Sequence, residues 1–159
     1  MKCPNCGSPM TTARENYRYD ECGLPNVTLR GVEVSRCSEC GEIDVAISRI
    51  EKLHFAIAKA LIERTERLQA VEIRFLRKWL GWSGTDLAQV MGVTKETVSR
   101  WENDKEPMGP IAERLLRMCV ANLAPLENYS VDILKALQDT CKTKHLYLEE
   151  IGKDWIAAA

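Results

Sequence analysis

The sequence has few of the features that mark membrane proteins or simple electrostatic binders of nucleic acid. No apolar run approaches the roughly 18 residues that a membrane-spanning helix needs. The start MKCPNCG contains no apolar signal region. Lys and Arg total 22 against 23 Asp and Glu, so the net charge is −1 and bulk attraction to a polyanion is weak. We therefore expect a cytoplasmic protein, without membrane segments, whose contacts with charged partners depend on local surfaces.

Signatures of catalysis are also scarce. The chain has two histidines, His54 and His145, and neither lies in a stretch of Ser, Asp or Glu that would suggest acid–base or nucleophilic chemistry. It contains no glycine-rich phosphate loop, nucleophile elbow or zinc-protease helix motif. These absences predict a protein that is not an enzyme.

The chain divides into four segments by pattern. A turn-rich segment with alternating apolar residues (1–45) is followed by an amphipathic helix (46–67), a group of short helical patterns (68–123) and a C-terminal extension without an assigned role (124–159). The predicted fold class is mainly α, with a small β-rich zinc-binding N-terminal domain and a C-terminal helix-turn-helix domain. A length of 159 residues suits one ordinary domain, or a small domain plus a smaller one that is braced by metal or disulfides.

The first segment alternates in the manner of short antiparallel strands. Tyr17 and Tyr19, then Val27 and Leu29, occupy every second position, with turn signals at residues 23–26 and at Gly31. So short a segment cannot bury enough apolar surface to fold unaided, and we expect a covalent or metal brace.

Two pairs of cysteines supply that brace. Each pair has a two-residue gap and is followed by glycine, which allows two thiolates per turn to reach one ion: Cys3, Cys6, Cys37 and Cys40. Cytosolic thiols stay reduced, which favours metal binding over disulfides. The spacing predicts one tetrathiolate zinc site per chain, structural because no ligand position is open to water. A rubredoxin-like iron site and unliganded thiols remain alternatives.

The other three cysteines have simpler interpretations. Cys22 lies inside the predicted strand region, where a packed or exposed thiol is the first interpretation and a spare ligand or redox thiol the second. Cys119 and Cys141 occupy apolar helical positions and are expected to be core residues.

Four helical patterns fill residues 68–123. The second begins at Ser83, with Asp86 three residues later as in a capping box, and ends at Gly92. The third begins at Thr94, so that the two form a predicted helix-turn-helix. The fourth begins at Pro110. Its apolar residues are expected to face the core: Ile111, Leu115, Leu116 and Met118.

The third helix has the pattern of a DNA-reading element. Glu96, Arg100 and Asn103 share one stripe, whereas Val98 and Trp101 point the opposite way. Arg100 can bond to guanine O6 and N7, and Glu96 can accept from cytosine N4. The alternative is that Glu96 and Arg100 only pair with each other across one helical turn.

Charge predicts how such an element would be used. Basic and acidic residues are nearly equal in number between Ala70 and Leu123, so one copy offers little attraction to phosphates. A homodimer doubles the contacts and reads two half-sites about one helical turn apart. We therefore expect a homodimer on a palindromic double-stranded DNA operator.

The stretch GTDLAQVMGVTKETVSRWENDKEPMGPIAERLLRMC resembles the Xre/Cro family of helix-turn-helix repressors. The resemblance is specific at LAQVMGV and VSRWEND. It places base-reading positions at Lys95, Glu96 and Arg100, and phosphate-contacting positions at Ser83, Thr94, Thr97, Asn103 and Lys105. One departure is Gly84, which stands where the family commonly has glutamine, so one side-chain contact is missing.

Together with CPNCG and YDECGLPNVTLRGVEVSRCSECGE, this domain resembles the MqsA/YgiT-type zinc-finger antitoxin family over residues 1–123. The resemblance implies zinc on the four cysteines and an N-terminal domain that sequesters an RNA-cleaving toxin. It also implies a C-terminal domain that dimerises and represses its own operon. Two alternatives remain: a stand-alone zinc-braced regulator without a toxin, and a metal- or redox-responsive protein that uses Cys22 and iron.

The C-terminal extension gives the weakest pattern. Ser130 would cap a helix whose apolar face includes Val131, Leu134, Leu137 and Cys141. The stretch HLYLEEIGKDWIAAA fits either a β-hairpin or a frayed helix.

Overall fold

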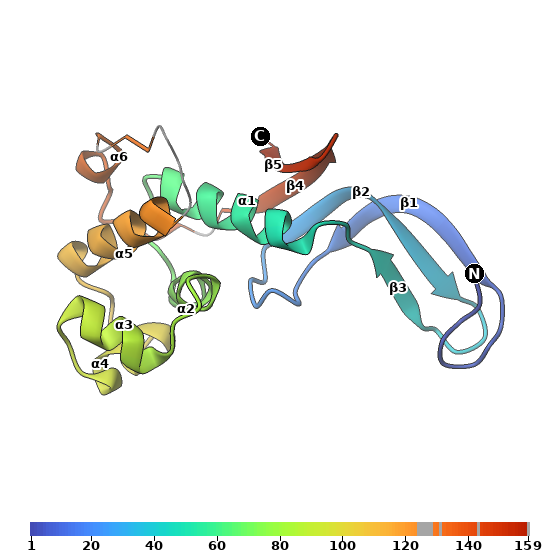
Figure 1. The fold of residues 1–159 in the computed structure, drawn as a ribbon, viewed down its shortest axis with the longest axis horizontal. Helices are drawn as coiled ribbons and strands as arrows, with labels where there is room; N and C mark the ends of the chain where they lie inside the picture. The colour runs from blue at the N-terminus through green and yellow to red at the C-terminus, as the bar shows by residue number, and fades with distance from the viewer. Residues whose placement is uncertain (124–128, 131, 143, 159) are drawn as a thin grey trace.

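The computed structural model describes residues 1–123, 129–130, 132–142 and 144–158. It places a curved β-sheet at one end of the molecule and a group of short helices at the other (Figure 1). Helix α1 (Ile50–Glu63) runs between the two ends, and the N-terminus lies at the tip of the sheet far from the helices. This arrangement confirms the predicted fold class, a small β-rich N-terminal part followed by a helical region.

A long antiparallel hairpin forms the N-terminal part of the sheet. It consists of β1 (Met10–Arg18) and β2 (Val27–Cys37). The prediction of a turn at Gly31 is wrong, because this residue lies inside β2. The pairing register with β1 shifts between Glu15 and Tyr17, and this bulge accommodates the extra residue without ending the strand.

The end of the chain completes the sheet that the first segment begins. Strand β3 (Ile43–Ala46) pairs antiparallel with one half of β2, and β4 (Leu146–Ile151) pairs parallel with the other half, from Val27 opposite Leu146. Strand β5 (Asp154–Ala158) then pairs antiparallel with β4. Of the two predicted alternatives for this stretch, the hairpin is therefore the one that forms.

Helix α1 covers the sheet with one apolar face. Leu53, Ile57 and Leu61 recur every four residues, are buried, and belong to the same apolar cluster as Leu29 and Leu148 of the sheet. Burial of each such side chain contributes about 1.5–3 kcal/mol. This shared core holds strands from the two ends of the sequence against one helix.

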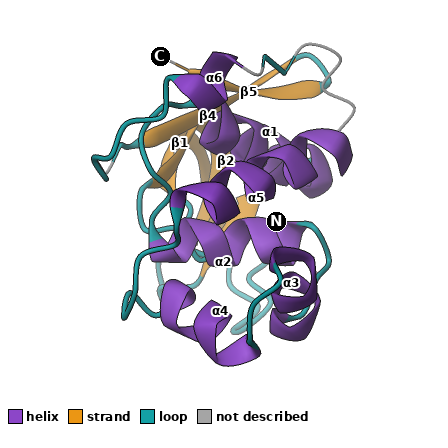
Figure 2. Cartoon of the chain, turned by 90° about the vertical axis from the view of Figure 1, so that its left-hand side faces the viewer, coloured by secondary structure: helices purple, strands orange, loops and turns teal. Residues whose placement is uncertain are grey.

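The helical end consists of short elements, and Figure 2 shows them from that end, in front of the sheet. They are α2 (Ala70–Trp79), α3 (Gly84–Met91), α4 (Lys95–Glu102), α5 (Pro110–Leu123) and α6 (Asp132–Lys135). Leu76, Leu87, Val98 and Leu116 are buried between them. In the part of the chain that the structure describes, no helix is both long and apolar enough to cross a bilayer.

Helix α5 has two apolar faces, and only one of them faces the core. Leu116 and Val120 are buried, but Ile111 is 83% exposed, and Leu115 and Met118 are also exposed. The prediction that Ile111, Leu115 and Met118 belong to the core is therefore wrong. Their spacing of i, i+4 and i+7 gives a second stripe that points into solvent.

The extension differs from the predicted helix between Ser130 and Cys141. Helix α6 has four residues, Leu137 and Cys141 lie outside it, and Val131 falls outside the described residues. Cys141 is exposed, so its predicted core position is wrong, while Cys119 is half-buried.

Backbone hydrogen bonds explain why that segment is not helical. The N–H of Gln138 donates to the carbonyl of Thr65 at 3.0 Å, and the N–H of Arg67 donates to the carbonyl of Thr140 at 3.2 Å. A continued helix would use these backbone groups for its own hydrogen bonds, but here they bond to the α1–α2 connection.

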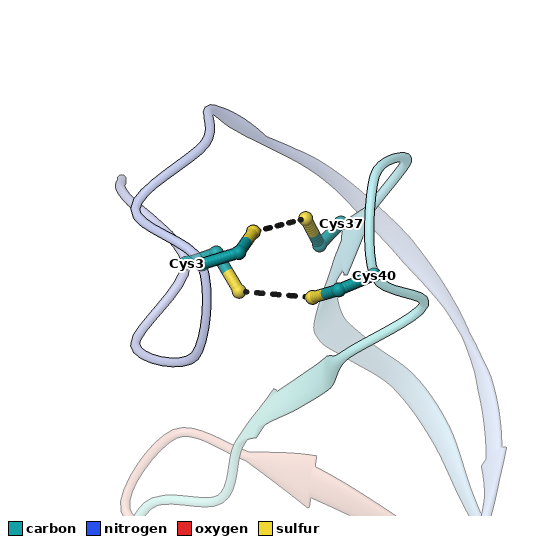
Figure 3. A group of neighbouring side chains, drawn as sticks. Cys3, Cys37 and Cys40 are labelled. Atoms are coloured by element: carbon teal, nitrogen blue, oxygen red, sulfur yellow. Dashed lines mark hydrogen bonds between the residues drawn. The ribbon is translucent and has the colours of Figure 1, made fainter.

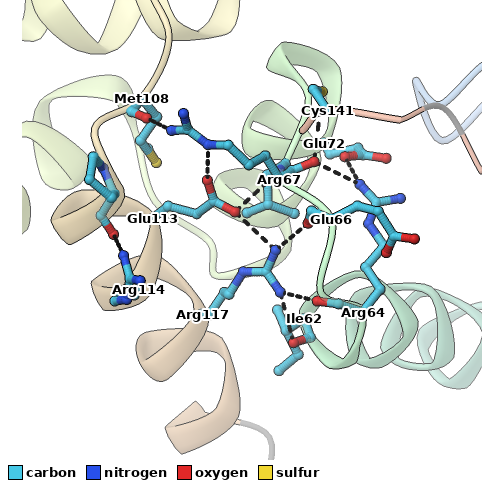
Figure 4. Close-up of polar contacts among 12 residues, drawn as sticks. Ile62, Arg64, Glu66, Arg67, Glu72, Met108, Glu113, Arg114, Arg117 and Cys141 are labelled. Carbon is cyan, nitrogen blue, oxygen red and sulfur yellow. Dashed lines mark hydrogen bonds and ion pairs between the residues drawn. The ribbon is translucent and has the colours of Figure 1, made fainter. Parts of the chain in front are cut away.

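A buried arginine ties α5 to the end of α1 (Figure 4). Arg117 is fully buried and donates to the carbonyls of Ile62, Arg64 and Glu66, and to the carboxylate of Glu113 at 2.9 Å. The last carbonyls of a helix have no partner within that helix, so the guanidinium satisfies acceptors that burial would otherwise leave unpaired. The sheet and the helical end are thus joined through a polar contact in addition to the apolar core.

Candidate metal centre and nucleic-acid interface

The two cysteine turns have the same backbone geometry. In the first, the N–H of Cys3 donates to the carbonyl of Ser8 at 2.8 Å, and the N–H of Gly7 donates to the carbonyl of Cys3 at 2.9 Å. In the second, the N–H of Gly41 donates to the carbonyl of Cys37 at 3.1 Å. Both glycines have positive φ, 76° and 75°, a conformation that costs little only for glycine.

Strand pairing brings the two turns together. Met10 lies opposite Cys37 in the β1–β2 register, so both turns are at the same end of the hairpin. The sulfurs of Cys3 and Cys40 are 3.5 Å apart and those of Cys6 and Cys37 are 3.4 Å apart (Figure 3). All four sulfurs lie within 4.8 Å of one another. A tetrahedral zinc site with Zn–S bonds of about 2.3 Å has S···S edges of about 3.8 Å, so the cluster has the required size.

The electrostatics of the cluster favour a cation at its centre. Hydrogen bonds from the hydroxyl and the backbone of Ser8 lower the pKa of the Cys6 thiol to about 6. A hydrogen bond from the backbone of Glu42 lowers the pKa of the Cys40 thiol, but desolvation and the neighbouring sulfurs outweigh it and raise that pKa to about 12. Four thiolates at this distance repel one another unless a cation lies between them.

These four cysteines form a tetrathiolate donor set that fits structural zinc, as predicted. All four positions of the tetrahedron are taken by sulfur, so bound zinc would brace the fold and would have no site for water. Cys22 is outside the cluster; its thiol donates to the carbonyl of Tyr19 at 3.5 Å, and burial raises its pKa. A raised pKa makes a thiol less reactive, which disfavours a redox role.

The predicted helix-turn-helix forms with its expected caps. Ser83 precedes α3, where its hydroxyl accepts from the N–H of Asp86 at 3.1 Å and the Asp86 carboxylate accepts from the N–H of Ser83 at 2.7 Å. Gly92 ends α3 in the left-handed conformation, with φ 68°. Thr94 then caps α4 by accepting from the N–H of Thr97 at 3.2 Å. The turn between the helices is therefore fixed by side-chain and backbone hydrogen bonds at both ends.

Helix α4 presents its predicted reading face to solvent. Lys95, Glu96 and Arg100 are exposed, while Val98 and Trp101 are buried against the other helices. The predicted pair of Glu96 with Arg100 does not form; instead, Arg100 Nη1 lies 3.3 Å from Oε2 of Glu106. In the described structure Glu96 forms no ion pair with Arg100, and both side chains point away from the core.

The predicted phosphate-contacting residues lie around the same face. Ser83, Thr94 and Thr97 are caps or first-turn residues of α3 and α4, and Lys105 is exposed in the connection after α4. Asn103 ends α4, where its side-chain amide donates to the carbonyl of Ser99 at 2.7 Å. The polar atoms of Ser83, Thr94 and Thr97 lie at the N-terminal ends of α3 and α4, where an anion is favoured, whereas Asn103 and Lys105 lie at the C-terminal end of α4.

Two arginines of α2 that sequence reasoning missed hold α4 in place. Arg77 forms a bidentate ion pair with the buried carboxylate of Glu102, with Nη2 to Oε2 at 3.0 Å. Arg74 donates to the carbonyl of Glu102 at 2.7 Å and to Oδ1 of Asn103 at 2.9 Å. The spacing of i and i+3 places the two arginines on one helix face and could have indicated a shared partner. The sequence does not, however, identify a partner 25 residues away.

The histidines have structural contacts. His54 Nε2 lies 2.9 Å from the hydroxyl of Tyr19, and its ring packs edge-on against Phe75. His145 Nε2 lies 2.8 Å from the hydroxyl of Thr28 in the neighbouring strand. The first bond joins α1 to the residue after β1, the second joins the residue before β4 to β2, and each gives the histidine a role in packing.

Comparison with known families agrees with this geometry. Residues 73–119, from α2 to α5, match the model of the helix-turn-helix family HTH_3. No curated protein matches the chain. The family match and the exposed α4 face identify a DNA-binding transcriptional regulator with an Xre-type helix-turn-helix domain and a four-cysteine cluster.

Proposed function

We propose that the protein is a sequence-specific repressor in which residues 68–123 bind operator DNA. The observation that carries the proposal is the exposed α4 face within a capped helix-turn-helix, held against α2 by the Arg77–Glu102 ion pair. A rigid recognition helix retains its binding geometry without ordering cost. Inserted into a major groove, α4 would place its first turn nearest to the base edges.

The roles of the exposed residues follow from their hydrogen-bonding groups. Arg100 would bond to guanine O6 and N7, Glu96 would accept from cytosine N4, and Lys95 would donate to an acceptor on a neighbouring base. Five further residues would contact phosphates and set the register: Ser83, Thr94, Thr97, Asn103 and Lys105. Gly84 lacks a side chain for the contact that glutamine makes in similar repressors, so specificity would depend more on α4.

The second apolar stripe of α5 supports a homodimer. Ile111, Leu115 and Met118 form one exposed face on a helix whose opposite face is buried. A two-fold contact between two such stripes would remove them from water and place two α4 helices on one palindromic operator. The near balance of charge in this domain makes the doubled contacts necessary for stable binding.

Selection of duplexes from a random pool tests this function. The expected product is a palindrome whose half-sites are centred about one helical turn, 10 base pairs, apart. Sedimentation of the free protein should give a dimer, and Ile111→Glu should give a monomer that binds a half-site weakly. Selection without any enriched sequence would refute the repressor proposal.

We further propose that the N-terminal domain neutralises a toxin, as the resemblance to zinc-finger antitoxins implies. Strand β1 supports this, because among the described strands it pairs only with β2 and most of its nine residues are exposed. Such an edge can add a strand from another protein. Co-expression with the neighbouring genes and capture by the tagged chain should recover a stoichiometric RNA-cleaving protein. Specific DNA binding without such a partner would instead leave a stand-alone zinc-braced regulator.

A further inference from the structure

A cavity lies directly behind the recognition helix. It has a volume of about 560 Å³ and is formed where the α1–α2 connection, the α4–α5 connection and the segment around Asp139 meet. Buried apolar side chains line it: Leu68, Ile73, Trp101 and Met108. Small-molecule sites commonly have about 300–1,000 Å³ and an apolar lining with a few polar groups, and this cavity meets both criteria.

The polar groups at the mouth of the cavity are mainly acidic. Asp104, Glu106 and Asp139 line it and are exposed. Among the described residues that line the cavity, Arg67 is the cationic one, and it is already engaged: Nε lies 3.2 Å from Oε2 of Glu113, and the guanidinium also donates to the carbonyl of Met108. These contacts, drawn in Figure 4, hold the Arg67 guanidinium against Glu113, a carboxylate that it shares with Arg117.

Two of the three carboxylates are uncompensated. Within the described ranges neither Asp104 nor Asp139 forms an ion pair, whereas Glu106 pairs with Arg100 at 3.3 Å. The cavity therefore combines an apolar floor with a negative rim. A ligand that fits this combination has an apolar or aromatic body and a positively charged group, which the carboxylates and the face of Trp101 would both attract.

We propose that this cavity is an effector site for a small organic cation, an ammonium or amidinium carried on an aromatic-sized apolar body. The apolar body would lie against Ile73 and Trp101, and the cation would lie at the rim between Glu106 and Asp139. The regulatory part of this proposal rests on the proposed operator binding, whereas the binding site itself does not.

Glu106 connects the cavity to the reading face. It lines the cavity and also holds Arg100, the proposed guanine-reading residue. A cation that engages Glu106 would release Arg100 for DNA, so ligand should tighten operator binding. The expected gain is about two- to fivefold, the range for release of one exposed ion pair. By reciprocity, the operator should tighten ligand binding by the same factor.

Calorimetric titration of the full-length protein in its zinc-bound form, without DNA, tests the site. The probe is 2-phenylethylamine, a cation at pH 7, and the control ligand is 3-phenylpropionate, of similar size but opposite charge. Binding of the amine with no binding of the acid is the expected result. Asp139→Asn should weaken binding of the amine. The control is Asp132→Asn, which should leave the affinity unchanged, because Asp132 lies on the same segment but outside the cavity and is paired with Lys135.

Equal binding of the two ligands, absence of amine binding, or an unchanged affinity in Asp139→Asn would each overturn the assignment. Ala70→Phe, which fills the cavity from the first turn of α2, should abolish amine binding, and amine binding that persists in this variant would place the ligand elsewhere.

Operator binding with and without the amine tests the coupling separately. The amine should tighten operator binding by the wild type and have no effect on Glu106→Gln, which should bind the operator more tightly from the start. Binding of the amine without any change in operator affinity would refute the coupling and leave the site intact. A chain that binds amine but no specific DNA would instead refute the proposed function.

Discussion

The two ends of this molecule are stabilised in different ways. The tip of the sheet consists of the cysteine turns and a hairpin whose outer strand is largely exposed. The helical end buries apolar residues from four helices and adds buried ion pairs. Bound metal at the tip would perform the structural role that apolar burial performs in the helices. We therefore expect loss of metal to change the tip while the DNA-reading face remains folded.

Loss of zinc should have the largest effect, and it should unfold the tip of the sheet while the helical end stays folded. In Cys37→Ser one of four ligands is lost, and zinc-binding energies of about 10–16 kcal/mol in small zinc domains are largely folding energy. We expect no bound zinc and loss of amide protection in β1, with protection in α2–α5 retained, as measured by elemental analysis and hydrogen exchange.

Cys22→Ser is the matched control, because this cysteine lies outside the cluster. It should retain one zinc per chain and wild-type exchange. A Cys37→Ser protein with unchanged protection in β1 would show that the tip does not need the metal.

Removal of the buried Arg117 side chain should have the next largest effect, and it should destabilise the junction between α5 and the end of α1. Arg117→Ala leaves the Glu113 carboxylate and three carbonyls without this donor, at a cost of about 3–5 kcal/mol in the free energy of unfolding. Arg114→Ala, at a half-buried position of the same helix where the side chain bonds only to the carbonyl of Pro110, should cost about 1 kcal/mol or less. Denaturant unfolding measures both, and equal costs would contradict the role of Arg117.

Arg100→Ala should reduce base discrimination by the helical end without changing its fold. We expect loss of about 1–3 kcal/mol of discrimination for the guanine that Arg100 would read, with zinc content and melting temperature unchanged. Competition between the selected operator and a variant duplex at constant salt measures this. If Arg100→Ala retained full preference for the selected operator, α4 would not read DNA in the proposed way.

The cap of α3 should give the smallest effect. Ser83→Ala should cost about 1 kcal/mol of stability, and Ser83→Asn should restore most of it. Hydrogen bonds from the side chain and backbone of Ser83 lower the pKa of Asp86. Their contribution to stability is therefore fully present above the unfolded pKa of Asp86 and is lost as pH falls through the lower folded pKa. The difference in melting temperature between wild type and Ser83→Ala should accordingly become smaller below pH 4, and an unchanged difference would contradict the capping box.

Local patterns allowed much of the metal site and the helix-turn-helix to be predicted. Each cysteine turn needs only a two-residue gap and a glycine, and each cap needs one residue before the helix. Accordingly, the four ligands, the Ser83 and Thr94 caps and the burial of Val98 and Trp101 agree with the prediction.

Contacts between distant residues could not be predicted in this way. The pairing of Val27 with Leu146 and the bonds from Arg117 to the end of α1 depend on tertiary packing. The α5 stripe was misassigned because periodicity shows that a face is apolar without showing what covers it. The pairing of Arg100 with Glu106, six residues along, lies beyond the helical neighbours that spacing rules consider.

Hydrogen exchange of the zinc-bound protein with and without the selected operator tests the central claim most directly. We expect new protection between residues 83 and 105, at the start of α3 and along α4, with protection of the sheet unchanged. Protection confined to the sheet, with residues 94–105 unaffected by DNA, would contradict the assignment of α4 as the reading helix.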